Sequence, residues 1–173
     1  MIGKIKSFFK KNDGATAVEF SLLVMPFMLV VLGILEISLM FLSAAIVEGA
    51  TDSASRIIRT GQLQKDGGDP ETLFRDALCS FTGALVNCGD MAVEVVRMDS
   101  YFDFTQPVYD GDGNLVPQGF DAGGSNDKVM IRVAWRYSMI TPLVGDLLNG
   151  ADGSTLFVST IVLQSEPYEF QGV

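Results

Sequence analysis

The 173-residue chain contains no histidine. Histidine is the commonest general base in enzymes and the commonest ligand of transition metals, so its absence excludes a histidine-dependent catalytic triad. Basic residues are also scarce, with 12 Lys and Arg against 21 Asp and Glu and a net charge of -9. A chain this acidic offers no basic patch to a nucleic acid. We therefore expect no enzymatic activity, no cofactor, no metal centre and no nucleic-acid partner.

Cysteine is nearly absent as well, and its two copies, Cys79 and Cys88, lie close together in the sequence. An even count at close spacing, in a part of the chain expected outside the cytoplasm, predicts one disulfide. Two reduced, buried thiols are the alternative. The spacing does not match a zinc site, and no histidine is available to complete one.

Apolar residues, by contrast, form one long run near the N-terminus. No residue from Phe20 to Leu35 is ionisable, and apolar residues dominate again after Glu36 as far as Val47. About 20 helical residues at ~1.5 Å each cross a bilayer, and this run is long enough to do so. Four lysines precede it, which places the N-terminus in the cytoplasm and the rest of the chain on the other side. The four are Lys4, Lys6, Lys10 and Lys11.

A short motif stands at the start of this run. A basic leader ends at Gly14, the sequence ATAVEF follows, and the acid Glu19 comes five residues after the glycine. This arrangement resembles the processing site of type IV prepilins, with cleavage between Gly14 and Ala15. Glu19 would then be the fifth mature residue and Phe20 the sixth.

Within the type IV group, the chain most resembles the TadE-like minor pseudopilins of the tight-adherence (Tad, or Flp) pilus. The ATAVEF form, the segment Gly33–Glu36, the ending Ser165–Pro167 and the chain length carry this resemblance. It implies a substrate of a prepilin peptidase that assembles with other pilins and an assembly platform into a pilus for surface adherence. It also implies a single-pass protein of the bacterial inner membrane with a periplasmic C-terminal domain, and possible incorporation into an extracellular pilus.

Three residues of the run are candidates for subunit assembly: Glu19, Phe20 and Glu36. The resemblance implies that Glu19 pairs with the free amine that cleavage creates on Ala15 of a neighbouring subunit. The alternative is that the positive helix N-terminus and the aqueous interface alone stabilise the Glu19 carboxylate. Glu36 falls near the far edge of the hydrocarbon layer, where it either reaches the headgroups or contacts another subunit. Pro26 removes one backbone hydrogen bond and should bend or loosen the helix.

The helix is predicted to continue beyond the membrane to about Thr60, because apolar residues recur at three- and four-residue spacing between Ile46 and Ile58. Gly61 is its expected end. A helix of this length measures ~67 Å. We therefore expect three parts: a leader at 1–14, a long helix at 15–60 that is transmembrane in its first half, and an exterior domain at 61–173.

The exterior domain is expected to be α+β. No long crossover helix connects the predicted strands, so an antiparallel sheet is favoured. The sheet would cover the exposed half of the long helix, which gives a pilin-like lollipop. The predicted elements are a turn at Lys65–Asp69, a helix at Glu71–Phe81, strands at Met91–Met98, Lys128–Ser138 and Leu156–Leu163, and a short helix at Leu143–Leu148.

The long segment between the first two strands, 99–127, is rich in glycine and aspartate. Thr105–Pro117 resembles a surface hairpin, and long segments of this kind often contact partners. Asp110–Asn114 places oxygen ligands at alternate positions, as calcium loops do. However, Leu115 stands where an EF-hand loop has glycine, so an acidic turn is the favoured interpretation.

Three functions remain open at this point. The first is a pilus subunit that assembles through its N-terminal helix. The second is a membrane-tethered periplasmic binding module that never enters a filament. The third is an exported enzyme with a cleaved secretory signal, which would use Ser43–Ala45 as the small-residue cleavage site. Phe20–Leu42 is much longer than the ~7–15 residues of a signal-peptide core, which disfavours the third.

Overall fold

The computed structural model describes residues 14–83, 86–141, 145 and 153–168. The chain divides into two compact units, which are described separately. The first unit comprises residues up to Ser38 together with Met139–Gly153, and the second comprises Leu39–Ser138 with residues from Ser154 onwards. The predicted leader lies outside the described residues except for Gly14, and the predicted helix at Leu143–Leu148 lies outside them except for Gly145.

Helix α2 (Ala15–Arg59) is the longest element of the chain, with 45 residues. It ends where the sequence predicts, at Gly61, which has a left-handed φ of 71°. Two features of the fold disfavour any side chain at position 61. Residues other than glycine rarely adopt its left-handed backbone conformation, and a Cβ there would lie 2.5 Å from the Tyr168 ring.

In the first unit, α2 is apolar on all sides. Leu22 and Leu23 are 70% and 72% exposed, and most of their apolar neighbours are exposed too. Among the described helices, α2 is the one that is long and apolar enough to cross a membrane. A helix that is apolar all round, with most of its apolar side chains exposed among the described residues, suits a lipid or helix-bundle environment.

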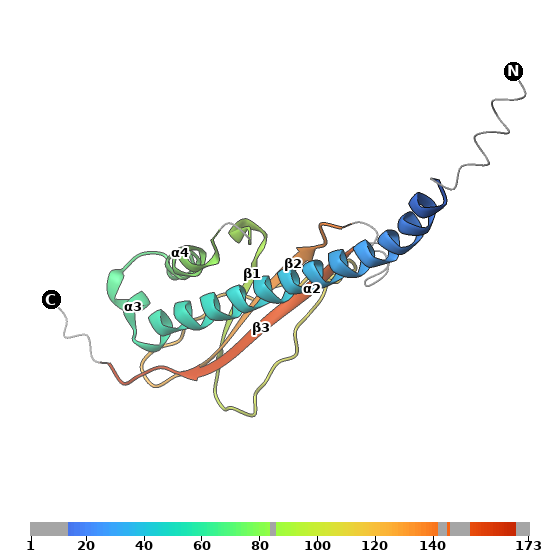
Figure 1. Cartoon of the computed structure of the whole chain (residues 1–173). Helices are drawn as coiled ribbons and strands as arrows, with labels where there is room; N and C mark the ends of the chain where they lie inside the picture. Colours follow the sequence, from blue (N-terminus) through green and yellow to red (C-terminus); the bar gives the residue numbers. More distant parts are fainter. Residues whose placement is uncertain (1–13, 84–85, 142–144, 146–152, 169–173) are drawn as a thin grey trace, which may run out of the picture. The chain divides into compact units, whose positions relative to one another are not determined.

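The second unit is an α+β domain, as expected (Figure 1). Its sheet has the order β1-β2-β3, and both pairings are antiparallel, with Val95 opposite Ile131 and Trp135 opposite Phe157. The predicted strands are confirmed, and β2 has the predicted bounds. The elements after α2 are α3 (Gln62–Asp66), α4 (Pro70–Thr82), the 3₁₀ turn η2 (Cys88–Asp90), β1 (Ala92–Met98), β2 (Lys128–Ser138) and β3 (Ser154–Gln164).

Helix α3 was not predicted; the sequence indicated only a turn, at Lys65–Asp69. Its five residues are too few to show an amphipathic period. Gly67, at the end of α3, adopts φ 65°, so the glycines of this stretch do end a helix rather than merely link two elements.

Helix α4 begins at Pro70, one residue before the predicted start at Glu71. Asp69 accepts a hydrogen bond from the Thr72 amide at 3.0 Å, and Pro70 occupies the first turn, where its missing N–H costs nothing. Hydrogen bonds from the Thr72 hydroxyl and amide lower the pKa of Asp69. Near the other end of α4, Cys79 forms a disulfide with Cys88 in η2, with a Cα–Cα distance of 5.5 Å. The predicted disulfide is therefore present.

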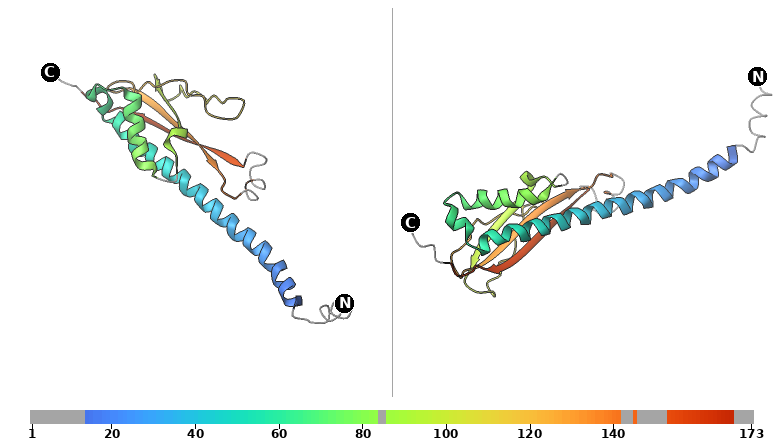
Figure 2. Two further views of the ribbon diagram at one scale, coloured as in Figure 1. Left: turned by 90° about the horizontal axis from the view of Figure 1, so that it is seen from above. Right: turned by 60° about the vertical axis from the view of Figure 1, so that its left-hand side comes forward.

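One face of the sheet packs against the helices. In Figures 1 and 2, the second half of α2 and α4 lie on the same side of the sheet. The buried residues of α2 recur at the predicted helical spacing, and every second residue of β1 and β2 faces the helices. The core on this side comprises Val47, Ala50, Ala54, Ile58, Val93, Val95, Ile131 and Val133.

The opposite face of the sheet is also buried at its centre, which was not expected. Arg132 lies on the face of β2 opposite Ile131 and Val133, and it is only 1% exposed. Its guanidinium donates to Glu94 on β1 at 3.0 Å and also to the backbone oxygen of Thr105, and it lies 5.0 Å from the Phe104 ring centroid. Segment 99–127 therefore covers this face, as Figure 2 shows (left), and Arg132 fastens the segment to it.

The buried ion pair gives a prediction about stability. In Arg132→Met, a buried carboxylate loses its partner, and we expect the free energy of unfolding to fall by about 3–5 kcal/mol. Glu94→Leu should be similarly destabilised, whereas the double variant should lose less than either single variant, because no buried charge remains unpaired. Unfolding of the full chain by urea in detergent micelles can be followed by the fluorescence of Trp135, the single tryptophan.

Arg97→Met is the matched control. Arg97 lies on the same strand as Glu94, but its side chain is 49% exposed in its contacts with Asp99 and Asp127. Such a pair contributes about 0–1 kcal/mol. Equal destabilisation in Arg97→Met and Arg132→Met would contradict the assignment of Arg132 as an anchor.

Candidate functional site

The predicted cleavage site coincides with the start of α2. The helix begins at Ala15, directly after Gly14, and both residues are exposed. A Cβ added at Gly14 would have no atom within 4 Å. The fold described here therefore places no steric requirement on a glycine at this position.

Glu19 and Phe20 lie one turn into α2 and face outwards. Phe20 is 66% exposed, and Glu19 is exposed as well. Within the part of the chain that the structure describes, no hydrogen bond or ion pair reaches the Glu19 carboxylate. The first turn of α2 contains no acid, and the effect of the helix dipole falls off beyond that turn. Stabilisation by the helix N-terminus alone therefore accounts poorly for Glu19.

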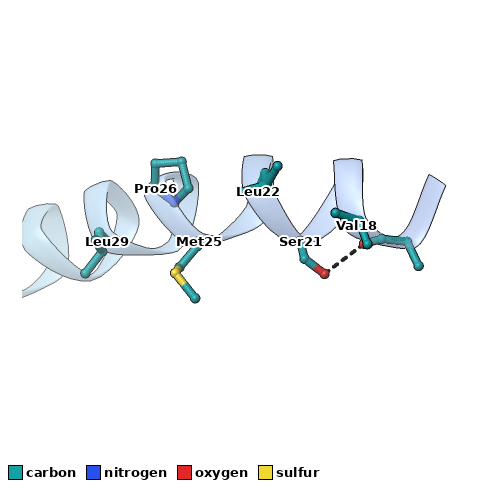
Figure 3. Close-up of a pocket in the computed structure, with 7 residues that line it drawn as sticks. Val18, Ser21, Leu22, Met25, Pro26 and Leu29 are labelled. Atoms are coloured by element: carbon teal, nitrogen blue, oxygen red, sulfur yellow. Dashed lines mark hydrogen bonds between the residues drawn. The ribbon is translucent and has the colours of Figure 1, made fainter. Parts of the chain in front are cut away.

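A shallow apolar groove runs along α2 beyond this point. Val18, Leu22, Met25 and Leu29 line it, together with Ala17, Ser21 and Pro26 (Figure 3). The hydroxyl of Ser21 donates to the backbone oxygen of Ala17 at 2.8 Å, so even this polar side chain is satisfied within the helix. The groove accordingly offers apolar packing to another helix and little hydrogen bonding.

Pro26 lies within this groove and within an uninterrupted helix. Since proline has no N–H, it cannot donate to the carbonyl of Leu22. Membrane helices tolerate such a freed carbonyl where neighbouring groups or water satisfy it. The loosened turn therefore adjoins the apolar groove.

Glu36 differs from Glu19 in having partners within its own chain. Although it lies in an apolar stretch of α2, it is only 3% exposed. Its carboxylate accepts hydrogen bonds from the amides of Ile140 and Thr141, at 2.8 and 3.0 Å, and from the Thr141 hydroxyl at 2.8 Å. All three residues belong to the first unit. Glu36 thus holds the chain that follows β2 against the helix.

Neither sequence interpretation of Glu36 included this intramolecular role. The signal that could have revealed it is the short helix predicted at Leu143–Leu148, directly after Thr141. The first amides of a helix need acceptors from outside the helix, and a carboxylate is a strong one.

The acidic turn at Asp110–Asn114 is held by its own hydrogen bonds. The Asp110 carboxylate accepts from the amides of Asp112 and Asn114, at 3.0 and 2.7 Å, and these bonds lower the pKa of Asp110. The Arg136 guanidinium donates to the Asp112 backbone oxygen and to the Asn114 side chain, at 3.1 and 3.0 Å. The Arg136 guanidinium therefore already binds oxygens of Asp112 and Asn114 that a calcium ion would need. This supports the interpretation of the segment as a plain acidic turn.

The Glu36 contacts give a prediction about local dynamics. Glu36→Ala removes both acceptor oxygens, so the amides of Ile140 and Thr141 should exchange with solvent roughly ten- to hundredfold faster. Glu36→Gln keeps one acceptor oxygen and should show an intermediate effect. Hydrogen exchange of the full chain in micelles, resolved by mass spectrometry, measures this.

Glu48→Ala is the control, because Glu48 is an exposed acid on the same helix and has no contact with residues 139–141 among the described interactions. An unchanged rate of hydrogen exchange at the Ile140 amide in Glu36→Ala would rule out the hydrogen bonds between Glu36 and residues 140–141. Loss of subunit crosslinking with unchanged exchange would instead indicate a contact with a neighbour.

Comparison with known proteins gives one family. Residues 14–56 match the family described as TadE-like protein. No curated protein and no solved structure matches the chain. The matched segment begins at Gly14 and includes Glu19, Phe20, the apolar groove and Glu36, and it ends before the sheet. The match confirms the resemblance seen in the sequence over residues 14–56, and over that segment the chain is similar to TadE-like proteins.

Proposed function

We propose that this chain is a minor pilin, or pseudopilin, that a prepilin peptidase cuts between Gly14 and Ala15 and that assembles through α2 into a Tad-type pilus used in adherence. The observation that carries the proposal is the TadE-like match, whose first residue is Gly14. Cleavage there would leave α2 whole, because the helix begins at Ala15. The mature protein would then act by packing rather than by catalysis.

The proposed topology follows from charge. The four lysines of the leader favour a cytoplasmic N-terminus, so the first half of α2 would cross the inner membrane and the sheet would lie in the periplasm. An oxidising periplasm is also where a disulfide such as Cys79–Cys88 persists. The proposed parts remain a leader at 1–14, a helix at 15–60 and an exterior domain at 61–173.

In the proposed mechanism, Glu19 and the apolar groove make the contact between subunits. Cleavage creates a cationic amine on Ala15, and an apolar surrounding makes an unpaired carboxylate costly. A neighbour's amine would therefore pair with Glu19 while apolar side chains around Phe20 and Met25 pack helix against helix. Glu36 would act indirectly, since its carboxylate already binds Ile140 and Thr141 of the same chain.

A membrane-tethered binding module is the second candidate, and exposed aromatic side chains favour it. Tyr101, Phe102 and Phe104 on segment 99–127 are 53%, 95% and 53% exposed. Exposed aromatic residues are frequent anchors in protein–protein contacts. Under this function, the chain would retain its leader and would not crosslink through α2.

The first test is processing. Gly14→Val should abolish cleavage, because the folded chain has room for a Cβ at this position and the need for glycine would come from the peptidase. The intact mass and N-terminus of protein recovered from its native membrane give the result. Wild type should begin at Ala15, whereas Gly14→Val should begin at Met1.

Gly49→Val is the matched control, since Gly49 is also exposed and a Cβ there has no atom within 4 Å. Its N-terminus should be Ala15. A wild-type chain that begins at Met1 in cells with an active peptidase would overturn the proposal in favour of the tethered module. A chain that begins near Ile46 would indicate a secreted soluble protein.

The second test concerns Glu19. Glu19→Gln keeps the size of the side chain but removes its charge, so the pairing with a neighbour's amine is lost. Cysteines placed on adjoining α2 helices should then crosslink about tenfold less, as expected for loss of one charged contact in an apolar setting. Processing should be unaffected.

Glu71→Gln serves as the control, because Glu71 makes an exposed ion pair with Arg75 on α4, in the second unit. Its crosslinking should match wild type. Equal crosslinking in Glu19→Gln and wild type would contradict the role of the carboxylate in assembly.

A further inference from the structure

Strand β3 forms one edge of the sheet and has unusual composition for an edge. Its eleven residues, STLFVSTIVLQ, include no charged side chain and no proline. Six of them are large and apolar, yet none of the eleven is fully buried. Exposed edges usually carry charges, proline or bulges, because an unprotected edge pairs with other strands.

The other edge of the sheet is protected. Strand β1 includes Glu94 and Arg97. Its outer side is also covered by its own chain, since the amide of Val95 donates to the Gly119 oxygen at 3.0 Å and the amide of Asp121 donates to the Val95 oxygen at 2.8 Å. Within the part of the chain that the structure describes, β3 has no equivalent cover.

A groove runs between this edge and α2. In Figures 1 and 2, β3 runs beside the second half of the helix. One stretch of the groove, about 450 Å³, is lined by Ala44, Val47, Glu48 and Asp52 on the helix and by all of Phe157–Ile161 on the strand. The face of a strand would contribute alternate residues only, so consecutive residues place the groove along the backbone edge.

The groove is acidic along one stretch and balanced in charge along the other. Beside Phe157–Ile161, the helix presents the exposed acids Glu48 and Asp52 and no basic residue. Beside Ile161–Leu163, Arg56 and Arg59 are accompanied by Asp52 and by Glu166, which lies 3.5 Å from Arg59. A segment with acids beside Glu48 and Asp52 would therefore be repelled, whereas one with bases there would be attracted.

A second copy of the chain is a poor occupant. Antiparallel pairing of β3 with β3 of another copy would require a two-fold axis, which reverses the direction of the helical segment Leu39–Arg59. The two chains would then enter these segments from opposite ends, which two copies inserted in the same membrane with the same orientation cannot do. The occupant is therefore more consistent with a different chain.

We propose that the edge of β3 is a strand-addition site, which takes an extended segment of another subunit antiparallel to β3. The segment would hydrogen-bond to the outer backbone edge of Phe157–Leu163 and fill the groove beside α2. Because it runs opposite to β3, its C-terminal half would meet Glu48 and Asp52 and carry bases, and its N-terminal half would meet the stretch where Arg56 and Arg59 are balanced by acids. This site does not depend on cleavage at Gly14.

A designed peptide tests the proposal. The probe is an eleven-residue peptide, matched to the length of β3, that alternates valine with polar residues, with glutamates in its N-terminal half and lysines in its C-terminal half. Added to the full chain in micelles, it should slow the hydrogen exchange of residues 154–164. A peptide with the charges interchanged should bind about tenfold more weakly, because two or more exposed pairs become repulsive.

Charge reversal in the groove provides the matched test. Glu48→Lys/Asp52→Lys should weaken binding of the first peptide about tenfold and reduce or reverse the preference between the two peptides. Asp76→Lys/Asp112→Lys changes the net charge equally at two exposed acids outside the groove and should bind like wild type. Thermal unfolding of both variants checks that they fold.

Two results would overturn the proposal. One is unchanged exchange of β3 with either peptide, at concentrations where the fold is intact. The other is exchange of β3 that slows as the protein alone is concentrated, which would make a second copy the occupant. Neither result would bear on processing at Gly14, so the proposed function is tested separately.

Discussion

A single helix has to satisfy two different surroundings, and the rest of the structure depends on how it does so. Up to Ser38, α2 is apolar on every side and its side chains are largely exposed. From Val47 to Ile58, within the second unit, only one stripe is apolar, and that stripe is buried against the sheet. Uniform apolarity suits a surround of lipid or other helices, whereas a stripe suits one packed face. The change between them occurs around Glu36 and Leu39, close to the boundary of the two units.

The other face of the sheet of the second unit is stabilised by arginines as well as by buried apolar residues such as Met130 and Ala134. Arg132 binds Glu94 and the backbone of Thr105, and Arg136 binds the turn at Asp112–Asn114. A guanidinium has five donors in a fixed plane, so one side chain can hold both a strand and a covering segment. Segment 99–127 can therefore be long and rich in glycine and aspartate and still have a defined path across the sheet.

Sequence patterns predicted the elements whose signals are local. The apolar run, the glycine after α2 and the strand at Lys128–Ser138 each depend on neighbouring residues, and all three are found. The patterns did not predict Arg132 as a buried residue or Glu36 as an acceptor for Ile140. The partners in these contacts are 27 and 104 positions away along the chain. The periods of a strand and a helix, 2 and 3.6 residues, carry information only about near neighbours. At the candidate site, the start of α2 followed from local signals and the contacts of Glu36 within its own chain did not, while the roles of Glu19 and Phe20 stay predictions.

The two carboxylates in the apolar part of α2 therefore differ in a way that composition alone conceals. Each carries a cost of desolvation in an apolar surround, and each must recover that cost through hydrogen bonds or a counter-ion. Glu36 recovers it within the chain, from two amides and a hydroxyl. Glu19 has no such donors among the described residues, and it lies at the end of the helix where another subunit's amine would be. If α2 is to be buried among neighbours, Glu19 is the acid that depends on them.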